Sequence, residues 1–231
     1  MKIETIATNP IEGQMPGTSG LRKKTRVFME PGYLENFVQA TFDAIGGGEG
    51  KTLIVGGDGR YFNKVAIQTI LKMAAGNGVV KVIVGKDGIL STPAASHLIR
   101  LNKADGGFIL SASHNPGGID EDFGIKFNGQ NGGPAPENLT AKIFDATKTI
   151  AKFKTVSTAE INLNACGSPS LGAMEVQIVD PVESYSALME TLFDFPAIRT
   201  LFKGGFTMCF DAMHAVTGPY AHAILEGMLD A

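Results

Sequence analysis

Two short apolar runs bounded by glycine constrain the fold of this chain more than any other feature. Residues 52–55 and 79–84 are rich in β-branched side chains, which is typical of strands buried on both faces. Between them, apolar residues recur at near-helical spacing from Val65 to Ala74, before a pair of glycines. This order of strand, helix and strand predicts an α/β fold and favours parallel pairing.

The same alternation continues on both sides of this unit. Further segments with strand or helix periodicity are 3–7, 33–45, 93–101, 107–110 and 137–150. We expect strands at 3–7 and 107–110 and helices in the other three segments. The helix at 33–45 ends at three consecutive glycines, which is a good stop signal. The prediction is a layered α/β/α domain with a largely parallel mixed sheet.

The pattern changes between about residues 150 and 171, where polar residues with Gly and Pro replace the periodicity. A new alternation begins near Met174, with expected elements at 176–179, 182–193, 206–210 and 220–229. These strands and helices are too few to make a covered sheet alone. We therefore expect one domain over residues 1–173 and, over residues 174–231, the incomplete start of a second, similar domain.

Charge and hydropathy exclude several classes of partner. A formal net charge of -3 provides no broad basic face for nucleic acid or anionic lipid. The first ten residues lack a basic segment followed by an apolar core, and no run of about 18 apolar residues occurs. We expect a cytoplasmic protein with neither nucleic-acid nor membrane partners, and the oligomeric state stays open. Cys166 and Cys209 are expected to be small core residues without a disulfide.

A sharp polar segment, SASHNPGG at 111–118, follows the predicted strand at 107–110. The ends of buried strands are where α/β enzymes place reactive groups. Ser113 needs a base or a charge-stabilising environment to act as a nucleophile, and His114, Asn115 and the glycines could supply donors to a phosphate. The residues alone leave a functional loop and an ordinary turn equally open. A serine-hydrolase site is disfavoured because the Gly-x-Ser-x-Gly elbow is absent.

Three other segments carry polar groups of interest. GTSGLR at 17–22 combines hydroxyls with Arg22, which could hold a phosphate bidentately or lie on the surface of a polar turn. Lys126 lies in a strand-like apolar run, where burial would lower its pKa and suit it to accept a proton unless it reaches solvent. GGDGR at 56–60 completes neither the Walker nor the dinucleotide pattern, so ATP and NAD are not inferred and a role for Arg60 stays open. The other histidines form no recognisable ligand set, and zinc is not proposed.

With these segments identified, the chain resembles the α-D-phosphohexomutases, and most closely their phosphoglucomutase branch. The matching motifs occur in family order: PGTSGLRK (16–23), GGDGRY (56–61), GILSTPA (88–94), SASHNPGG (111–118), DFGIKFN (122–128), NGGPAPE (131–137) and DAMHAVTGPY (211–220). They span nearly the whole chain and are highly specific together, whereas GGDGR alone would be weak.

The resemblance implies that Ser113 carries a transferable phosphate, with Ser111 in a position that threonine often occupies. It also implies catalytic roles for His114 and Lys126, and substrate binding by Thr18, Ser19, Arg22 and Asn115. The implied reaction interconverts glucose 1-phosphate and glucose 6-phosphate, with glucose 1,6-bisphosphate as activator and intermediate. Glucose phosphates are therefore the implied partners.

Mg²⁺ is the implied metal cofactor, and Ser113 would contribute one ligand through its phosphate oxygen. The sequence lacks the family's Asp-Gly-Asp-Gly-Asp-Arg metal loop, its Gly-Glu-Glu-Ser-type sugar loop and its later phosphate-clamping domain. We therefore expect that truncation or proteolysis has removed the remaining metal ligands and that this chain alone is inactive. The alternatives are a phosphomannomutase and a non-catalytic sugar-phosphate-binding module.

Overall fold

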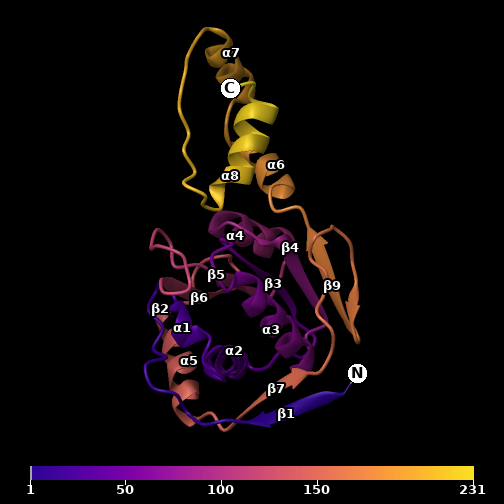
Figure 1. The fold of residues 1–231 in the computed structure, drawn as a ribbon. Coiled ribbons are helices and arrows are strands. Elements are labelled where there is room, and N and C mark those ends of the chain that lie inside the picture. Colours follow the sequence, from indigo (N-terminus) through magenta and orange to yellow (C-terminus); the bar gives the residue numbers. More distant parts are fainter. Residues whose placement is uncertain (1) are drawn as a thin grey trace.

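A seven-stranded mixed sheet forms the centre of the computed structural model, which describes residues 2–231 (Figure 1). In spatial order its strands are β2 (Leu21–Lys24), β6 (Asp122–Asn128), β5 (Gly106–Leu110), β3 (Thr52–Gly57), β4 (Lys81–Ile89), β9 (Met174–Val179) and β8 (Ser170–Leu171). Strands β5, β3, β4 and β9 pair in parallel, and the pairings outside them are antiparallel. The predicted mixed sheet is confirmed, with its parallel part at the centre.

Alternate residues of the central strands face two separate hydrophobic cores. In β3, Leu53 and Val55 pack into the larger core and Ile54 into the smaller one. In β5, Phe108 belongs to the larger core and Ile109 to the smaller. This strict alternation in fully apolar strands is what a sheet covered on both faces requires.

Helices cover both faces of the sheet, which confirms the layered α/β/α prediction. The larger core takes in α2 (Tyr33–Ala44), α3 (Asn63–Gly76) and α5 (Glu137–Thr149), and α4 (Thr92–Leu101) lies on the opposite face (Figure 1). A short helix, α1 (Thr25–Phe28), follows β2. The first turn of α4 is capped by Ser91, whose hydroxyl accepts from the Ala94 N–H, and Pro93 suits that turn because it needs no donor.

A separate two-stranded sheet joins the start of the chain to residue 156. Strand β1 (Ile3–Ala7) was predicted, and it pairs antiparallel with β7 (Lys152–Val156), which lies where the sequence showed only a weakening pattern. Gly76 at the end of α3 allows that helix to approach β7 closely. A Cβ atom there would lie 2.8 Å from the backbone nitrogen of Thr155.

Strand β9 corrects one detail of the predicted domain boundary between residues 173 and 174. It pairs in parallel with β4, and Val176 and Ile178 are buried in the larger core. The assignment of 176–179 to the second unit is therefore wrong, because these residues complete the first sheet. That the residues after β9 begin a second domain stays a prediction.

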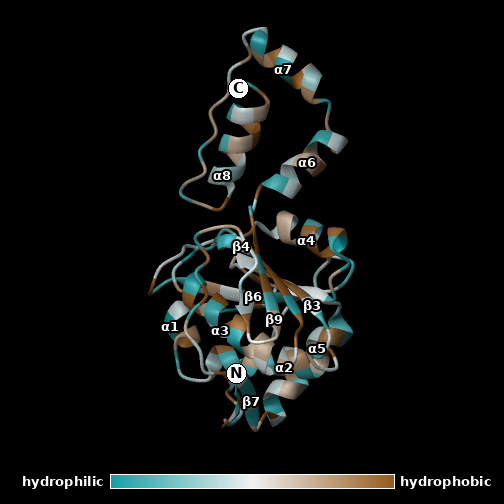
Figure 2. Cartoon of the chain, turned by 90° about the vertical axis from the view of Figure 1, so that its right-hand side faces the viewer, coloured by the Kyte–Doolittle hydropathy of each residue, from teal (hydrophilic) through white to brown (hydrophobic). Residues whose placement is uncertain are grey.

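The C-terminal helices extend away from the sheet on the side of α4 (Figures 1 and 2). They are α6 (Glu183–Leu192), α7 (Phe195–Lys203), α8 (Thr217–Ala221) and the π-helical η1 (His222–Met228). The hydroxyl of Tyr220 attaches them to α4 by accepting from the Ser91 N–H at 3.0 Å. The sequence pattern did not predict α7.

The expected strand at 206–210 is not formed among the described residues. Phe206, Met208 and Phe210 are exposed, and no neighbouring strand pairs with this segment in residues 2–231. The expectation that Cys166 and Cys209 are core residues is also wrong, because both are exposed; they are free thiols. Within residues 2–231, no helix has both the length and the apolar character that crossing a membrane requires.

Candidate active site

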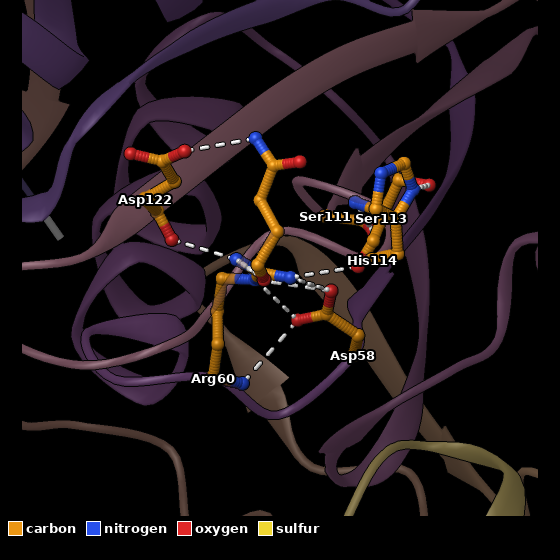
Figure 3. A network of polar contacts seen from close by, with 7 residues as sticks. Asp58, Arg60, Ser111, Ser113, His114 and Asp122 are labelled. Atoms are coloured by element: carbon orange, nitrogen blue, oxygen red, sulfur yellow. Dashed lines mark hydrogen bonds and ion pairs between the residues drawn. The ribbon is translucent and has the colours of Figure 1, made fainter.

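Ser113 lies in the loop that follows β5, called here the serine loop (residues 111–122), at the carboxyl edge of the parallel strands. Its φ of +59° is in the left-handed region, which is uncommon for a residue other than glycine. The Ser113 N–H donates to the Ser111 hydroxyl oxygen at 3.0 Å, and the exposed Ser113 hydroxyl lies 3.4 Å from Nδ1 of His114 (Figure 3). An anchored and strained backbone therefore presents an exposed hydroxyl to solvent.

Gly124 of β6 allows the base of this loop to approach the sheet closely. The Ser111 N–H donates to the Gly124 carbonyl at 2.9 Å. A Cβ atom on Gly124 would lie 2.2 Å from the Ser111 carbonyl oxygen and 3.2 Å from Cγ of Arg22. Because Gly124 has no side chain, the serine loop and Arg22 can lie close to each other.

Arg22 and Lys126 lie on the sheet face that carries α4. Their neighbours Leu21 and Ile125 point into the larger core, so strand alternation directs Arg22 and Lys126 to the opposite face. Lys126 is half-buried, and this burial lowers its pKa, with a further lowering from the nearby Arg22 charge. A lysine in this setting holds its proton less tightly than one in water.

Thr18 and Ser19 form the tip of a tight turn closed by reciprocal backbone hydrogen bonds between Gly17 and Gly20, at 3.1 and 2.9 Å. Gly20 has a φ of +86°, and a Cβ atom there would lie only 2.6 Å from Cβ of Lys126. The turn therefore rests against Lys126, and Thr18 and Lys126 line one small cavity. Both hydroxyl-bearing residues at the tip are exposed.

Asn115 is held within the loop by its own hydrogen bond. Its side-chain amide donates to a carboxylate oxygen of Asp122 at 2.8 Å. The pKa of Asp122 is lowered by its contact with Lys24 and, next, by this amide. A role for Asn115 in binding substrate stays a prediction, because this amide group already has a partner in the loop.

The structure thus groups the predicted residues in two adjoining sets. Ser113, His114 and Asn115 share the loop after β5, while Thr18, Ser19, Arg22 and Lys126 lie on the neighbouring β2 and β6 or the turn before them. Their roles as site residues stay predictions.

Sequence reasoning gave no assigned role to Asp58 and left Arg60 open. The Arg60 guanidinium lies under the serine loop and donates to the Ser113 carbonyl at 3.1 Å. The sequence did contain a signal for this contact, because Asp58 and Arg60 come directly after strand β3. Charges at that position reach the same sheet edge as the loop after a neighbouring parallel strand.

The described residues do not form a magnesium site by themselves. Among residues 2–231, no group of three or more His, Cys, Asp or Glu side chains could hold a metal ion. Mg²⁺ takes about six oxygen ligands in octahedral geometry, whereas a phosphate on Ser113 would supply one or two.

The family model described as "Phosphoglucomutase/phosphomannomutase, alpha/beta/alpha domain I" matches residues 13–154. The chain is 57% identical over 229 residues to the phosphoglucomutase of Rhizobium radiobacter, covering 99% of this chain and 42% of the relative. It is 56% identical over 225 residues to that of Schizosaccharomyces pombe, covering 96% and 41%. Two further relatives from Arabidopsis thaliana carry names that place one in the cytoplasm and the other in the chloroplast.

Among solved structures, the open form of pp63/parafusin, a phosphoglucomutase from Paramecium, matches with a TM-score of 0.94 and 44% identity. That match covers 98% of this chain and 43% of the solved chain, so the present chain spans less than half the length of these relatives. The match of the family model over more than half of the chain agrees with the relatives and with the fold. The chain belongs to the phosphoglucomutase/phosphomannomutase family.

Proposed function

We propose that this chain supplies the phosphoryl-carrying serine and the proton-transferring lysine of a phosphoglucomutase. The observation that carries the proposal is the exposed hydroxyl of Ser113 on a strained, anchored loop beside Arg22 and Lys126. The reaction is the interconversion of glucose 1-phosphate and glucose 6-phosphate. Its glucose preference rests on the names of the relatives, and mannose phosphates are the alternative substrates.

In the proposed reaction, a free hydroxyl oxygen of the sugar phosphate attacks the phosphorus on Ser113. The new O–P bond forms as the bond between Ser113 Oγ and phosphorus breaks, and glucose 1,6-bisphosphate results. Lys126 accepts the proton of the attacking hydroxyl, because its lowered pKa makes the neutral amine more available. After the bisphosphate turns over, its other phosphoryl group returns to Ser113 Oγ and Lys126 gives the proton back to the sugar oxygen.

The remaining predicted residues would bind the anionic substrate. Arg22 contributes a fixed positive charge, and Thr18 and Ser19 contribute exposed hydroxyls on the adjoining turn. His114 lies beside the Ser113 hydroxyl and could donate to its phosphate. We include Mg²⁺ and glucose 1,6-bisphosphate as cofactors on the strength of the family resemblance. The cytoplasm is the proposed compartment, and the name of one Arabidopsis thaliana relative supports it.

A chimera tests this proposal without requiring that residues 1–231 act alone. The chain would replace the matching part of the R. radiobacter phosphoglucomutase, to which it is 57% identical. The chimera should convert glucose 1-phosphate to glucose 6-phosphate when glucose 1,6-bisphosphate and Mg²⁺ are present, and intact mass should show one phosphate, located at Ser113 by peptide mapping.

The sugar loop of the chimera comes from the R. radiobacter enzyme, so its use of mannose 1-phosphate in a parallel assay would report on that loop and not on this chain. A folded chimera that binds glucose phosphates without isomerising them would favour the non-catalytic binding module and contradict the proposal. The intact R. radiobacter enzyme serves as the positive control for the assay.

A further inference from the structure

Asp58 and Arg60 form a nearly buried ion pair directly below the serine loop (Figure 3). Their side chains are only 14% and 7% exposed. Nε of Arg60 lies 3.0 Å from each carboxylate oxygen of Asp58, and Nη2 donates to one of these oxygens at 2.9 Å. This contact fixes the plane of the guanidinium group.

The other donors of Arg60 are directed at backbone carbonyls of the loop. Nη1 donates to the carbonyl of Asp122 at 2.6 Å and to that of Asn115 at 3.3 Å, while Nη2 donates to that of Ser113 at 3.1 Å. One planar group thus contacts two carbonyls near the beginning of the segment 113–122 and one at its end. The stem of Arg60 also lies against the loop, since a Cβ atom on Gly117 would be 3.2 Å from Cβ of Arg60.

A contribution to folding stability does not by itself explain this buried ion pair. A buried ion pair is often no more stabilising than apolar side chains of similar volume, because both charges lose their hydration. The pair instead fixes the directions of several hydrogen-bond donors, because a guanidinium carries them in one rigid plane. Ser113 is the loop residue that needs such support, because its left-handed backbone is unfavourable without it.

We propose that Arg60, oriented by Asp58, is a positioning residue for phosphoryl transfer. It holds the Ser113 carbonyl and the far end of the loop in one arrangement, and thereby fixes the direction in which the Ser113 hydroxyl points. This inference rests on the proposed function, because it assigns to Arg60 the geometry of the nucleophile that the function requires.

Two alternatives predict different behaviour. If Arg60 only balances the charge of Asp58, a lysine at position 60 would serve equally well. If the pair only closes the turn after β3, where the Arg60 N–H donates to Asp58 at 3.3 Å, the loop after β5 would be unaffected by changes in the guanidinium. The positioning role requires the fork of donors, which lysine lacks.

The first arm of the test uses the chain as it is. Amide hydrogen exchange followed by mass spectrometry would compare Arg60→Lys with the unaltered chain. We expect exchange in residues 111–122 to accelerate by about tenfold or more, while residues 53–55 of β3 keep their protection. Arg26→Lys is the matched control, because Arg26 contacts Asp120 of the same loop from the exposed side and its change should leave exchange unaltered.

The second arm uses the chimera described above and separates kcat from KM. Arg60→Lys should lower kcat by roughly tenfold to a hundredfold, since small displacements of a reacting group are costly, and should change KM by less than about threefold. Asp58→Glu keeps both charges but displaces the carboxylate, so it should lower kcat in the same direction. It also provides a second probe if Arg60→Lys fails to fold.

Unchanged kcat and unchanged loop exchange in Arg60→Lys would overturn the proposal, because charge balance alone would then suffice. Faster exchange in residues 53–55 to the same degree as in 111–122 would also overturn it, since the role would be general stability. An inactive unaltered chimera would count against the proposed function only. The exchange experiment on the chain would still decide whether Arg60 orders the loop.

Discussion

The serine loop at 111–122, which is irregular up to the start of β6, and the irregular segment at 204–216 both reach the surface, yet they are held in different ways. The serine loop is tied to distant parts of the chain through Arg60 and through the Thr25 N–H, which donates to the Glu121 carbonyl at 2.7 Å. It is also tied to the adjoining strand β6 through the Gly124 carbonyl. The second segment is held by local contacts such as the Met213 N–H to Asp211 at 2.8 Å. An irregular backbone can therefore be held firmly in place. Long-range hydrogen bonds distinguish the loop that carries the candidate site residues from the segment at 204–216.

Ser113→Ala should have the largest effect on activity and one of the smallest on the fold. Turnover of glucose 1-phosphate by the chimera should fall to background and the phosphate seen by mass should disappear, because the carrier oxygen is lost. The unfolding free energy should change by no more than about 0.5 kcal/mol, because the hydroxyl is exposed. Ser111→Ala is a useful comparison, since it removes the acceptor of the Ser113 N–H but leaves the carrier in place. Bisphosphate-dependent turnover by Ser113→Ala would reject this serine as the carrier.

Lys126→Met should lower kcat of the chimera by about a hundredfold or more, because the proton-accepting amine is removed. The same change should stabilise the chain at neutral pH. Burial and the Arg22 charge lower the pKa of Lys126 from its ordinary value of 10.5, so the unfolded chain binds this proton more tightly than the folded chain does.

The stability gain of Lys126→Met should therefore be greatest below the lowered pKa and should shrink as the pH rises from that value toward 10.5. Denaturant unfolding of both chains at several pH values would measure it. Equal turnover with altered stability would assign Lys126 a structural role, and a gain that grows with pH would show that its pKa is not lowered.

Gly124→Ala should weaken the ties that distinguish the serine loop. The new Cβ atom would meet the Ser111 carbonyl oxygen at 2.2 Å, so the loop or the strand must move, at a cost of about 1–3 kcal/mol in unfolding free energy. Gly167→Ala is the matched control, because no heavy atom lies within 4 Å of its Cβ position and its φ is not in the left-handed region. Comparable stability of the two variants in denaturant titrations would refute the close approach at Gly124.

Phe210→Ser tests the other side of the comparison and should have the smallest effect. Phe210 is 49% exposed in a segment without a paired strand among the described residues, so the unfolding free energy of the chain should change by no more than about 0.5 kcal/mol. The buried Phe108 of β5 provides the contrast, and Phe108→Ala should cost about 3–5 kcal/mol. A large loss in Phe210→Ser would mean that the segment is held by packing rather than by local hydrogen bonds.

Periodicity predicted those elements whose burial is decided by neighbouring residues. Strands β3 and β5 and helices α2, α3 and α4 were found within a few residues, because their apolar residues repeat at the period of the element. Strand β7 was missed because its pairing with β1 joins residues more than a hundred positions apart. The prediction of a strand at 206–210 was wrong for the opposite reason. The residues alternate as in a strand, but no other strand in residues 2–231 pairs with them.

The sequence indicated candidate site residues, whose roles stay predictions, but only part of their geometry. The end of a buried strand indicated Ser113, and the apolar neighbours of Lys126 correctly indicated burial and a lowered pKa. The contact of Arg60 with three carbonyls could not be foreseen, because main-chain acceptors look alike in any sequence. The hydrogen bond from Asn115 to Asp122 likewise depends on how the loop folds back.

The pairing of β1 with β7 has a consequence for how the chain folds. The register sets Ile3 opposite Val156, so this two-stranded sheet closes a loop that encloses almost the whole α/β domain. The entropy of closing so long a loop must be overcome before the pairing contributes, although the cost rises only slowly with length. Ile3 and Ile6 are 54% and 39% exposed, so the burial of apolar surface in β1 offsets little of this entropic cost. We therefore expect β1 to join after the central sheet has formed and to be the first strand to fray on heating.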